Sequence, residues 1–174
     1  MIDIPLTRPK SNEYKEYFER YISLVPEGNI LTLMQEQLQE FLKFFEKINE
    51  EKSGYSYKDG KWSIKEVLGH MIDTEHIMAC RALRIARNDK SSLPGFDENE
   101  FVDNAYFDKL SIASLIVLFE LTRKMTIALF KSFNSGQASA IGTADDYPIS
   151  VRSIAYIIVG HVTHHLKVIN DRYF

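Results

Sequence analysis

Apolar positions recur along the chain with the 3.6-residue period of an α-helix, and the alternating patterns typical of β-strands are absent. The pattern predicts a short helix over residues 12–23 and four long helices. The long helices are expected over residues 30–49, 63–88, 111–133 and 150–171. Four long helices in one short chain indicate an all-α protein that folds as a four-helix bundle.

The segments between the long helices differ in length, and the difference bears on topology. Residues 50–62 and 134–149 are expected to form turns and loops, whereas residues 89–110 form a much longer connection. Antiparallel neighbours need only a few linking residues, so this connection is long enough to cross the bundle. We therefore expect a crossover between the second and third long helices. Its acidic residues are expected to lie in a solvated loop: Asp97, Glu98 and Glu100.

The starts of two helices carry recognisable capping residues. Ser63 and Glu66 have the spacing of a capping box, in which each side chain accepts a hydrogen bond from the other residue's backbone N–H. Ser150 is the expected N-cap of the last helix. Asp145 and Asp146 are expected near the same helix start, where negative charge suits the helix dipole. We expect residues 1–29 to form an N-terminal extension with the short helix, and residues 30–174 to form the bundle.

The composition is close to that of an ordinary globular protein, with 45% hydrophobic residues and a net charge of −3. The single cysteine, Cys80, excludes a disulfide-stapled domain and is expected to be a small buried residue. A mildly acidic chain lacks the basic excess that nucleic-acid binding needs. Neither a secretory signal nor an apolar run of about 20 residues is present, so we expect a cytoplasmic protein with no membrane partner.

All five histidines fall in two short windows of the chain. His161 and His165 are four residues apart and therefore project from one face of the last helix, a face that also carries core-type apolar residues. His164 is rotated by about 60° from His161. His76 is rotated by more than about 100° from His70. We expect His76 and His164 to be solvated and to take no part in a site.

The remaining three histidines lie at comparable depth in the predicted bundle. His70 lies about 11 Å from the start of its helix, and the midpoint of His161 and His165 lies about 12 Å from the end of theirs. The three side chains lie at one level if these helices are antiparallel, and are offset by roughly 7 Å if they are parallel. This makes His70, His161 and His165 a candidate metal-binding triad. Buried structural histidines are the alternative.

Two glycines directly precede two of these histidines. A glycine inside a helix costs about 1 kcal/mol relative to alanine. Gly69 and Gly160 therefore indicate that something approaches the helix backbone closely at these positions. Both a packed neighbouring segment and a bound ligand fit that requirement.

Four short motifs, in this order, resemble the DinB/YfiT-like superfamily of metal-dependent enzymes. They are Trp62-Ser63-Ile64-Lys65-Glu66, Leu68-Gly69-His70-Met71-Ile72-Asp73, Leu93-Pro94-Gly95-Phe96-Asp97 and Gly160-His161-x-x-x-His165. The resemblance covers about residues 30–172. It implies a four-helix bundle with the crossover between the second and third long helices, and a homodimer. It also implies a divalent metal ion, zinc or nickel, held by His70, His161 and His165.

Members of this superfamily differ in activity. Several transfer low-molecular-weight thiols such as bacillithiol, mycothiol or glutathione, and others are described as hydrolases. The resemblance therefore implies, first, a transferase that joins a small thiol to an electrophilic substrate at a three-histidine metal centre. The alternatives are a metal-dependent hydrolase with the same triad and a non-catalytic bundle that binds a ligand or a protein.

Three neutral imidazoles would leave a bound ion with its full charge and an open coordination position, as in catalytic zinc sites. Such an ion lowers the pKa of a bound water or thiol. Asp73, one turn from His70, is a candidate to orient that imidazole, and Arg81 and Tyr147 are candidates to line the cavity. The sequence identifies no general base and no other catalytic residue.

Overall fold

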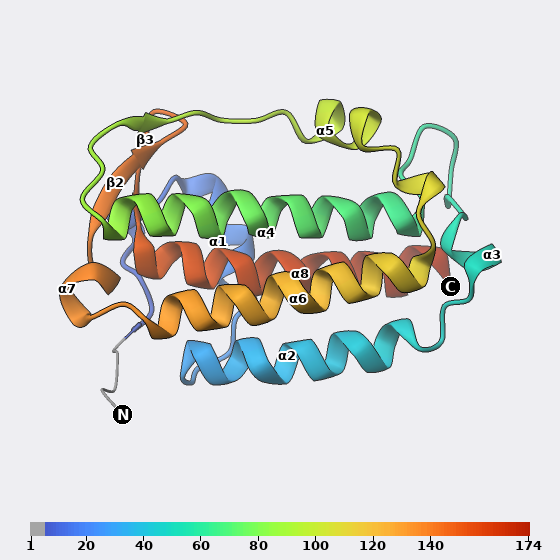
Figure 1. Ribbon diagram of the computed structural model, residues 1–174, viewed down its shortest axis with the longest axis horizontal. Helices are drawn as coiled ribbons and strands as arrows, with labels where there is room; N and C mark the ends of the chain where they lie inside the picture. Colours follow the sequence, from blue (N-terminus) through green and yellow to red (C-terminus); the bar gives the residue numbers. More distant parts are fainter. Residues whose placement is uncertain (1–5) are drawn as a thin grey trace.

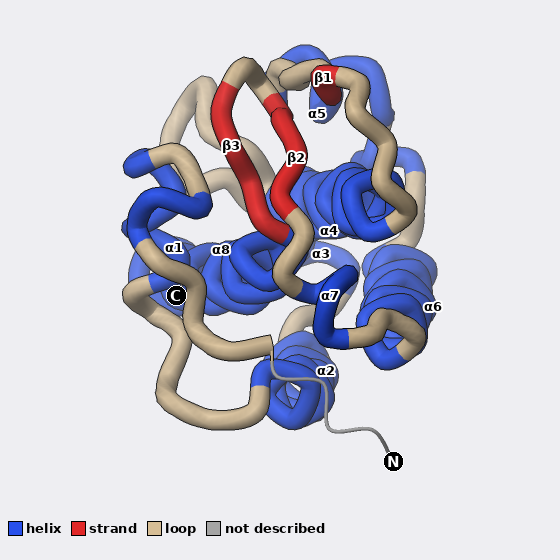
Figure 2. Tube along the Cα trace, turned by 90° about the vertical axis from the view of Figure 1, so that its left-hand side faces the viewer, coloured by secondary structure: helices blue, strands red, loops and turns tan. Residues whose placement is uncertain are grey.

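The computed structural model describes residues 6–174, and its main feature is a bundle of four long helices (Figure 1). They are α2 (Ile30–Phe45), α4 (Ile64–Ala86), α6 (Ile112–Lys131) and α8 (Val151–Tyr173). Helix α4 packs against α6 and α8, and α2 packs against the same two helices (Figure 2). Helices α4 and α6 run in one direction, whereas α2 and α8 run in the other (Figure 1). The predicted four-helix bundle with a long crossover is confirmed.

The crossover connection runs back along the length of α4 and contains structure of its own (Figure 1). It includes β1 (Ser92–Leu93), α5 (Glu98–Ala105) and the 3-10 helix η3 (Phe107–Lys109). The side chain of Asp97 accepts hydrogen bonds from the backbone N–H groups of Asn99 and Glu100, so Asp97 caps α5. The acidic residues are exposed as predicted, but they begin a helix instead of lying in an irregular loop.

A small three-stranded sheet, which the sequence pattern did not indicate, covers one end of the mostly helical bundle. Strand β2 (Ile141–Ala144) pairs in parallel with β1 and antiparallel with β3 (Tyr147–Ser150). Asp145 and Asp146 form the hairpin turn with φ angles of 52° and 61°. Positive φ at both central residues is the geometry that suits a two-residue hairpin. The prediction that these two aspartates lie at the start of α8 is therefore wrong. The strands themselves could not be detected from the sequence, because strands this short give too few positions for a period-2 pattern.

The predicted helix ends are close to the observed ones, with two exceptions near the N-terminus. Helix α2 stops at Phe45, and Asn49 caps the separate short helix α3 (Glu50–Ser53). The helix predicted over residues 12–23 is divided into η1 (Ser11–Glu13), η2 (Glu16–Phe18) and α1 (Glu19–Ile22). Another short helix, α7 (Ser135–Ala138), precedes β2.

Both predicted helix caps are confirmed. The Ser63 hydroxyl accepts from the Glu66 N–H, and the Ser63 N–H donates to the Glu66 carboxylate. The Ser150 hydroxyl accepts from the Ser153 N–H at the start of α8. These caps fix the starts of α4 and α8, the two helices that carry His70 and His161.

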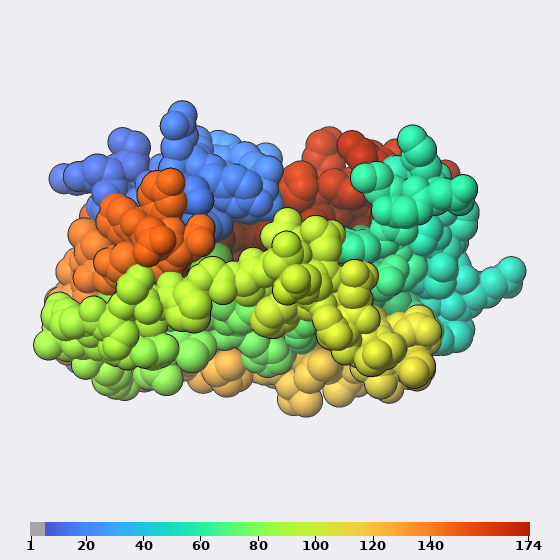
Figure 3. Space-filling view, turned by 90° about the horizontal axis from the view of Figure 1, so that it is seen from above, coloured from blue at the N-terminus to red at the C-terminus, as the bar shows by residue number. Residues whose placement is uncertain are grey.

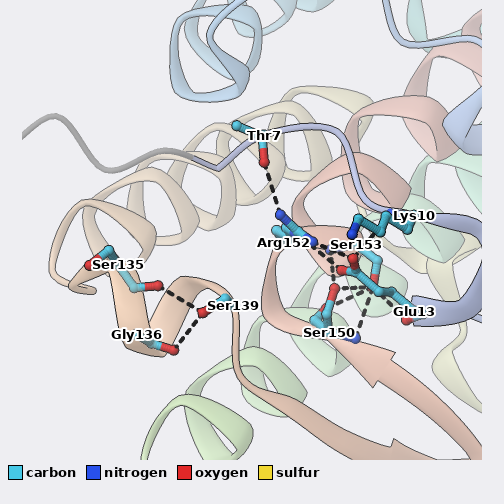
Figure 4. A network of polar contacts seen from close by, with 9 residues as sticks. All are labelled: Thr7, Lys10, Glu13, Ser135, Gly136, Ser139, Ser150, Arg152 and Ser153. Atoms are coloured by element: carbon cyan, nitrogen blue, oxygen red, sulfur yellow. Dashed lines mark hydrogen bonds and ion pairs between the residues drawn. The ribbon is translucent and has the colours of Figure 1, made fainter.

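The N-terminal segment is tied to the start of α8 by a polar network (Figure 4). Arg152 donates hydrogen bonds to the carboxylate of Glu13 and to the hydroxyl of Thr7. The hydrogen bond from Arg152 lowers the pKa of Glu13 to about 2. Helix α1 then packs directly on α8. Residues 1–5 of the expected extension lie outside the described residues.

The apolar core forms two clusters, one toward the sheet and one toward α3. Each of the four long helices also carries at least one buried polar residue: Gln37, His70, Glu75, Arg123 and His161. No helix within residues 6–174 is both long enough and apolar enough to cross a membrane. Cys80 is exposed, so the prediction that it packs in the core was wrong.

Candidate metal centre

Three histidines from two helices converge in the bundle. Helices α4 and α8 are antiparallel (Figure 1). His70 on α4 and the His161–His165 pair on α8 lie at one level. The Nε2 atom of His161 lies 3.0 Å from the Nε2 atom of His70 and 3.0 Å from that of His165. Ligand atoms of all three residues lie within 4.8 Å of one another. The structure therefore brings together the three residues that the sequence predicts as a triad.

The spacing of these nitrogens fits a single small cation. Tetrahedral zinc with zinc–nitrogen distances of about 2.0–2.1 Å holds its nitrogen ligands about 3.3 Å apart. The observed separations of 3.0 Å are close to this value. Imidazole ligands suit several divalent metals, among them zinc, copper, iron and nickel. The cluster is thus compatible with a divalent metal ion.

Burial keeps the three imidazoles neutral at pH 7. Desolvation lowers the pKa of His70 to about 4 and that of His165 to about 2. Desolvation, together with the charges of the neighbouring histidines, also holds the pKa of His161 well below its usual value. The neutral imidazole is the form that binds a metal, so the site does not have to lose protons before an ion enters.

The other two histidines are not part of the cluster. His76 is exposed, as predicted, and its Nε2 atom lies 3.0 Å from the hydroxyl oxygen of Thr122. His164 is half-buried instead of fully solvated, because its ring packs edge-on against Tyr21 with the centroids 5.5 Å apart. The ring of Tyr21 contacts His161 in the same way, at 5.2 Å.

Packed chain segments explain both glycines beside the histidines. A Cβ atom at Gly160 would overlap the backbone carbonyl of Tyr21, so the absence of a side chain allows α1 to lie directly on α8. A Cβ atom at Gly69 would overlap the ring of Phe107 from the crossover. Of the two explanations that the sequence left open, close packing of protein segments is the observed one.

Two cavities reach the histidine cluster from different sides. The first has a volume of about 190 Å³, touches His70 and His161, and opens between the N-terminal segment, the β2–β3 hairpin and the crossover (Figure 3). The second has a volume of about 330 Å³ and touches His164 and His165. The rest of its lining contains no acidic side chain and includes five aromatic or basic ones: Tyr57, Lys61, Trp62, Arg172 and Tyr173.

The residues predicted to line the cavity or to orient His70 differ in where the structure places them. Arg81 lines the first cavity, as predicted. Tyr147 does not line it; its exposed ring lies under the ammonium group of Lys15. Within residues 6–174, no hydrogen bond joins Asp73 to an imidazole of the cluster.

Sequence reasoning did not place several other residues at the first cavity. Thr74 is one helical turn after His70, and this spacing was a usable signal. Lys15, Tyr21 and Asp145 are distant in sequence and reach the cavity only because of how the N-terminal segment and the hairpin fold. No local pattern could have indicated them.

Comparison with known proteins identifies a family and a similar solved structure. The sequence profile of the DinB superfamily matches residues 33–169. Among solved structures, the fold is similar to YfiT from Bacillus subtilis, described as a probable metal-dependent hydrolase with an unusual four-helix bundle topology. The two chains are 17% identical with a TM-score of 0.68, and the match covers 95% of this chain and 90% of that one. A search of curated proteins gave no significant match.

Proposed function

We propose that this chain, which belongs to the DinB superfamily, is a metal-dependent enzyme whose divalent ion is held by His70, His161 and His165. The convergence of the three Nε2 atoms carries this proposal. An ion on three neutral imidazoles supplies an open coordination position and lowers the pKa of a thiol or water bound there. We propose zinc or nickel as the metal, since the family resemblance implies these two and imidazole ligands suit both.

The more specific proposal is a transferase that joins a low-molecular-weight thiol to an electrophile. Its support is the pair of cavities on different sides of the cluster, since two organic reactants need two binding spaces that meet at one point. The second cavity suits the thiol, because its basic and aromatic lining would bind acidic and apolar groups of such a molecule. Arg172 is held at this wall by a hydrogen bond of 3.0 Å to the hydroxyl of Tyr57.

The second candidate function is hydrolysis at the same triad. It is favoured by the structural likeness to YfiT, which is described as a probable metal-dependent hydrolase. A hydrolase would need one cavity for its organic substrate and water at the ion. The third candidate is a non-catalytic bundle in which the histidines only pack.

One set of measurements separates these functions. Elemental analysis of purified protein, followed by titration with zinc and nickel, should give about one bound ion per chain. Metal-loaded protein should consume an electrophile only when a small thiol is present. Thiol-independent hydrolysis of an ester would favour the hydrolase instead. Protein that contains no metal and takes up none would contradict both enzymatic proposals and leave the non-catalytic bundle.

The proposed partners are small molecules together with a second copy of the chain, and neither nucleic acid nor a membrane. An apolar stripe on α6 is exposed along one face and supports the homodimer: Val117, Leu118, Leu121 and Met125. Glu120 and Lys124 form an ion pair beside this stripe. In a twofold-symmetric antiparallel pair of α6 helices, the opposite charges of the two copies would face each other.

We expect Leu121→Glu to convert this dimer to a monomer, because the leucine is 59% exposed at the centre of the stripe. Sedimentation velocity or light scattering measures the change in mass. Glu36→Gln on α2, also at an exposed position, is the control that should leave the mass unchanged. A wild-type protein that stays monomeric at high micromolar concentration would contradict the proposed dimer.

A further inference from the structure

A buried arginine lies on the same helix face as His70. His70, Thr74, Met78 and Arg81 follow one another on α4 at intervals of four, four and three residues, and all four line the first cavity. Arg81 is only 6% exposed. The cavity therefore has a cationic side chain within its wall, on the same face as one of the proposed metal ligands.

The guanidinium of Arg81 has few partners within the protein. It donates one hydrogen bond of 2.6 Å to the carbonyl of Pro94, and a second nitrogen lies 3.9 Å from the sulfur of Met78. Across residues 6–174, no carboxylate lies within 4.0 Å of it. A guanidinium has five N–H donors, and a buried charge is costly unless it is paired. Arg81 therefore has capacity for an anionic ligand.

The two acidic residues that line the cavity are exposed, and neither forms an ion pair with Arg81. Asp145 is exposed, and its carboxylate pairs with the ammonium group of Lys15 at 3.1 Å. Glu98 is also exposed. Asp145 raises the pKa of Arg81, but burial has the larger, opposite effect. The protein thus leaves the charge of Arg81 incompletely compensated.

Thr74 provides a second polar group without a partner. Its Oγ1 atom is buried and has no hydrogen-bond partner among the described residues. A threonine inside a helix commonly donates to the carbonyl four residues before it, as Thr122 does to Leu118 at 2.8 Å. Thr74 makes no such bond, so its hydroxyl is available to a molecule in the cavity.

We propose that the first cavity binds an electrophilic substrate that carries a carboxylate group, with Arg81 pairing the carboxylate and Thr74 donating a hydrogen bond to the same molecule. This inference rests on the proposed metal-dependent function and adds the class of substrate. The planar guanidinium fork matches a carboxylate in a two-bond arrangement. A cavity of about 190 Å³ restricts the substrate to a small molecule. Arg81 and Thr74 would thereby hold the carboxylate end of the substrate in a fixed place relative to His70 and His161.

The test compares two probes of equal shape and different charge, propionate and propionamide. Nuclear magnetic resonance titration gives the dissociation constant of each probe for metal-free and for zinc-loaded protein. We expect propionate to bind at least about tenfold more tightly than propionamide in both forms, because only the carboxylate pairs with the guanidinium. Arg81→Gln should remove this preference in both forms. Arg84→Gln is the matched control, since Arg84 lies one turn away in a half-exposed ion pair with Asp89, and it should leave both constants unchanged.

The threonine is tested by two matched variants. Thr74→Val and Thr126→Val each replace a buried hydroxyl that lacks a hydrogen-bond partner in the described residues, but only Thr74 lines the cavity. Thr74→Val should weaken propionate binding by about fivefold, the effect of one hydrogen bond. Thr126→Val should leave it unchanged. If Arg81→Gln fails to fold because its hydrogen bond to Pro94 is lost, these two threonine variants still test whether propionate binds in the first cavity.

Three results would overturn the proposal. The first is equal binding of propionate and propionamide to the wild-type protein. The second is a preference for propionate that remains in folded Arg81→Gln protein. The third is a preference for propionate that appears only with zinc bound and is the same in all variants. The last result would mean that the ion itself binds the carboxylate. Failure of the metal centre is distinguishable, because it would abolish zinc uptake while the metal-free protein kept its preference for propionate.

Discussion

Substitution of His161 by alanine is expected to abolish tight binding of zinc or nickel while the bundle remains folded. His161 is the central member of the cluster, since its Nε2 atom is the one that lies 3.0 Å from the other two. Without it, His70 and His165 leave two ligands, fewer than the three or four that zinc sites in proteins use. We expect the affinity for the metal to fall by at least about 100-fold, because the loss of a direct ligand exceeds the 10–100-fold cost of losing a supporting residue.

His164→Ala is the matched control for this experiment. His164 precedes His165, is half-buried and also packs against Tyr21, but it does not belong to the cluster. This variant should bind one ion per chain with nearly wild-type affinity. Metal content after loading and desalting measures the difference between the two variants directly.

Thermal unfolding provides an independent measurement. A ligand that binds only the folded state stabilises it by about 2.7 kcal/mol when its free concentration is about 100 times the dissociation constant. Added zinc should therefore raise the melting temperature of the wild-type and His164→Ala proteins but not that of His161→Ala. Equal metal content in all three proteins would show that the ion binds elsewhere and would contradict the proposed centre.

The histidine cluster could be predicted because its geometry depends on regular helices. The four-residue spacing of His161 and His165 fixes one face of α8, and the capped start of α4 fixes the depth of His70. The long crossover then makes α4 parallel to α6, and α8 is the antiparallel neighbour of α4. The spacing, the depth and the length of the crossover are properties of the sequence, whereas the sequence left open whether α4 and α8 are antiparallel or parallel.

The walls of the cavities could not be predicted in the same way. Asp145 reaches the first cavity from a hairpin turn, and Lys15 reaches it from an N-terminal segment with little regular structure. The hairpin has strands of only four residues and an Asp-Asp turn, which lacks the glycine that usually indicates this turn type. The exposure of Cys80 also depends on tertiary packing, because the residue type alone favours burial.

A buried ionic network was also missed, because its members come from four separate helices and are distant in sequence. The guanidinium of Arg123 donates to both carboxylate oxygens of Glu75, from Nε at 2.8 Å to Oε1 and from Nη2 at 2.8 Å to Oε2. Its third nitrogen donates to the Gln37 side-chain oxygen at 2.7 Å. Gln37 in turn donates to the Val159 carbonyl and the Thr163 hydroxyl, both at 2.8 Å. Val159 and Thr163 flank His161 on α8, so this network links all four helices at the level of the metal centre.

Arg123→Met is therefore expected to lower the free energy of unfolding by about 3–5 kcal/mol, because it leaves the carboxylate of Glu75 buried without its counter-charge. The side chains of Arg123 and Glu75 are 0% and 1% exposed, so water cannot replace the lost partner.

The double variant Arg123→Met/Glu75→Leu removes both charges and should recover most of the loss, since apolar residues of similar volume can replace a buried ion pair. Lys124→Met is the control at the next position, where the side chain is 59% exposed in its pair with Glu120, and it should change stability by less than about 1 kcal/mol. Urea denaturation of the four proteins gives these values. The penalty is expected to arise from the unpaired carboxylate of Glu75 and not from the missing arginine itself. A loss below about 1 kcal/mol for Arg123→Met, or a double variant no more stable than the single one, would contradict this explanation.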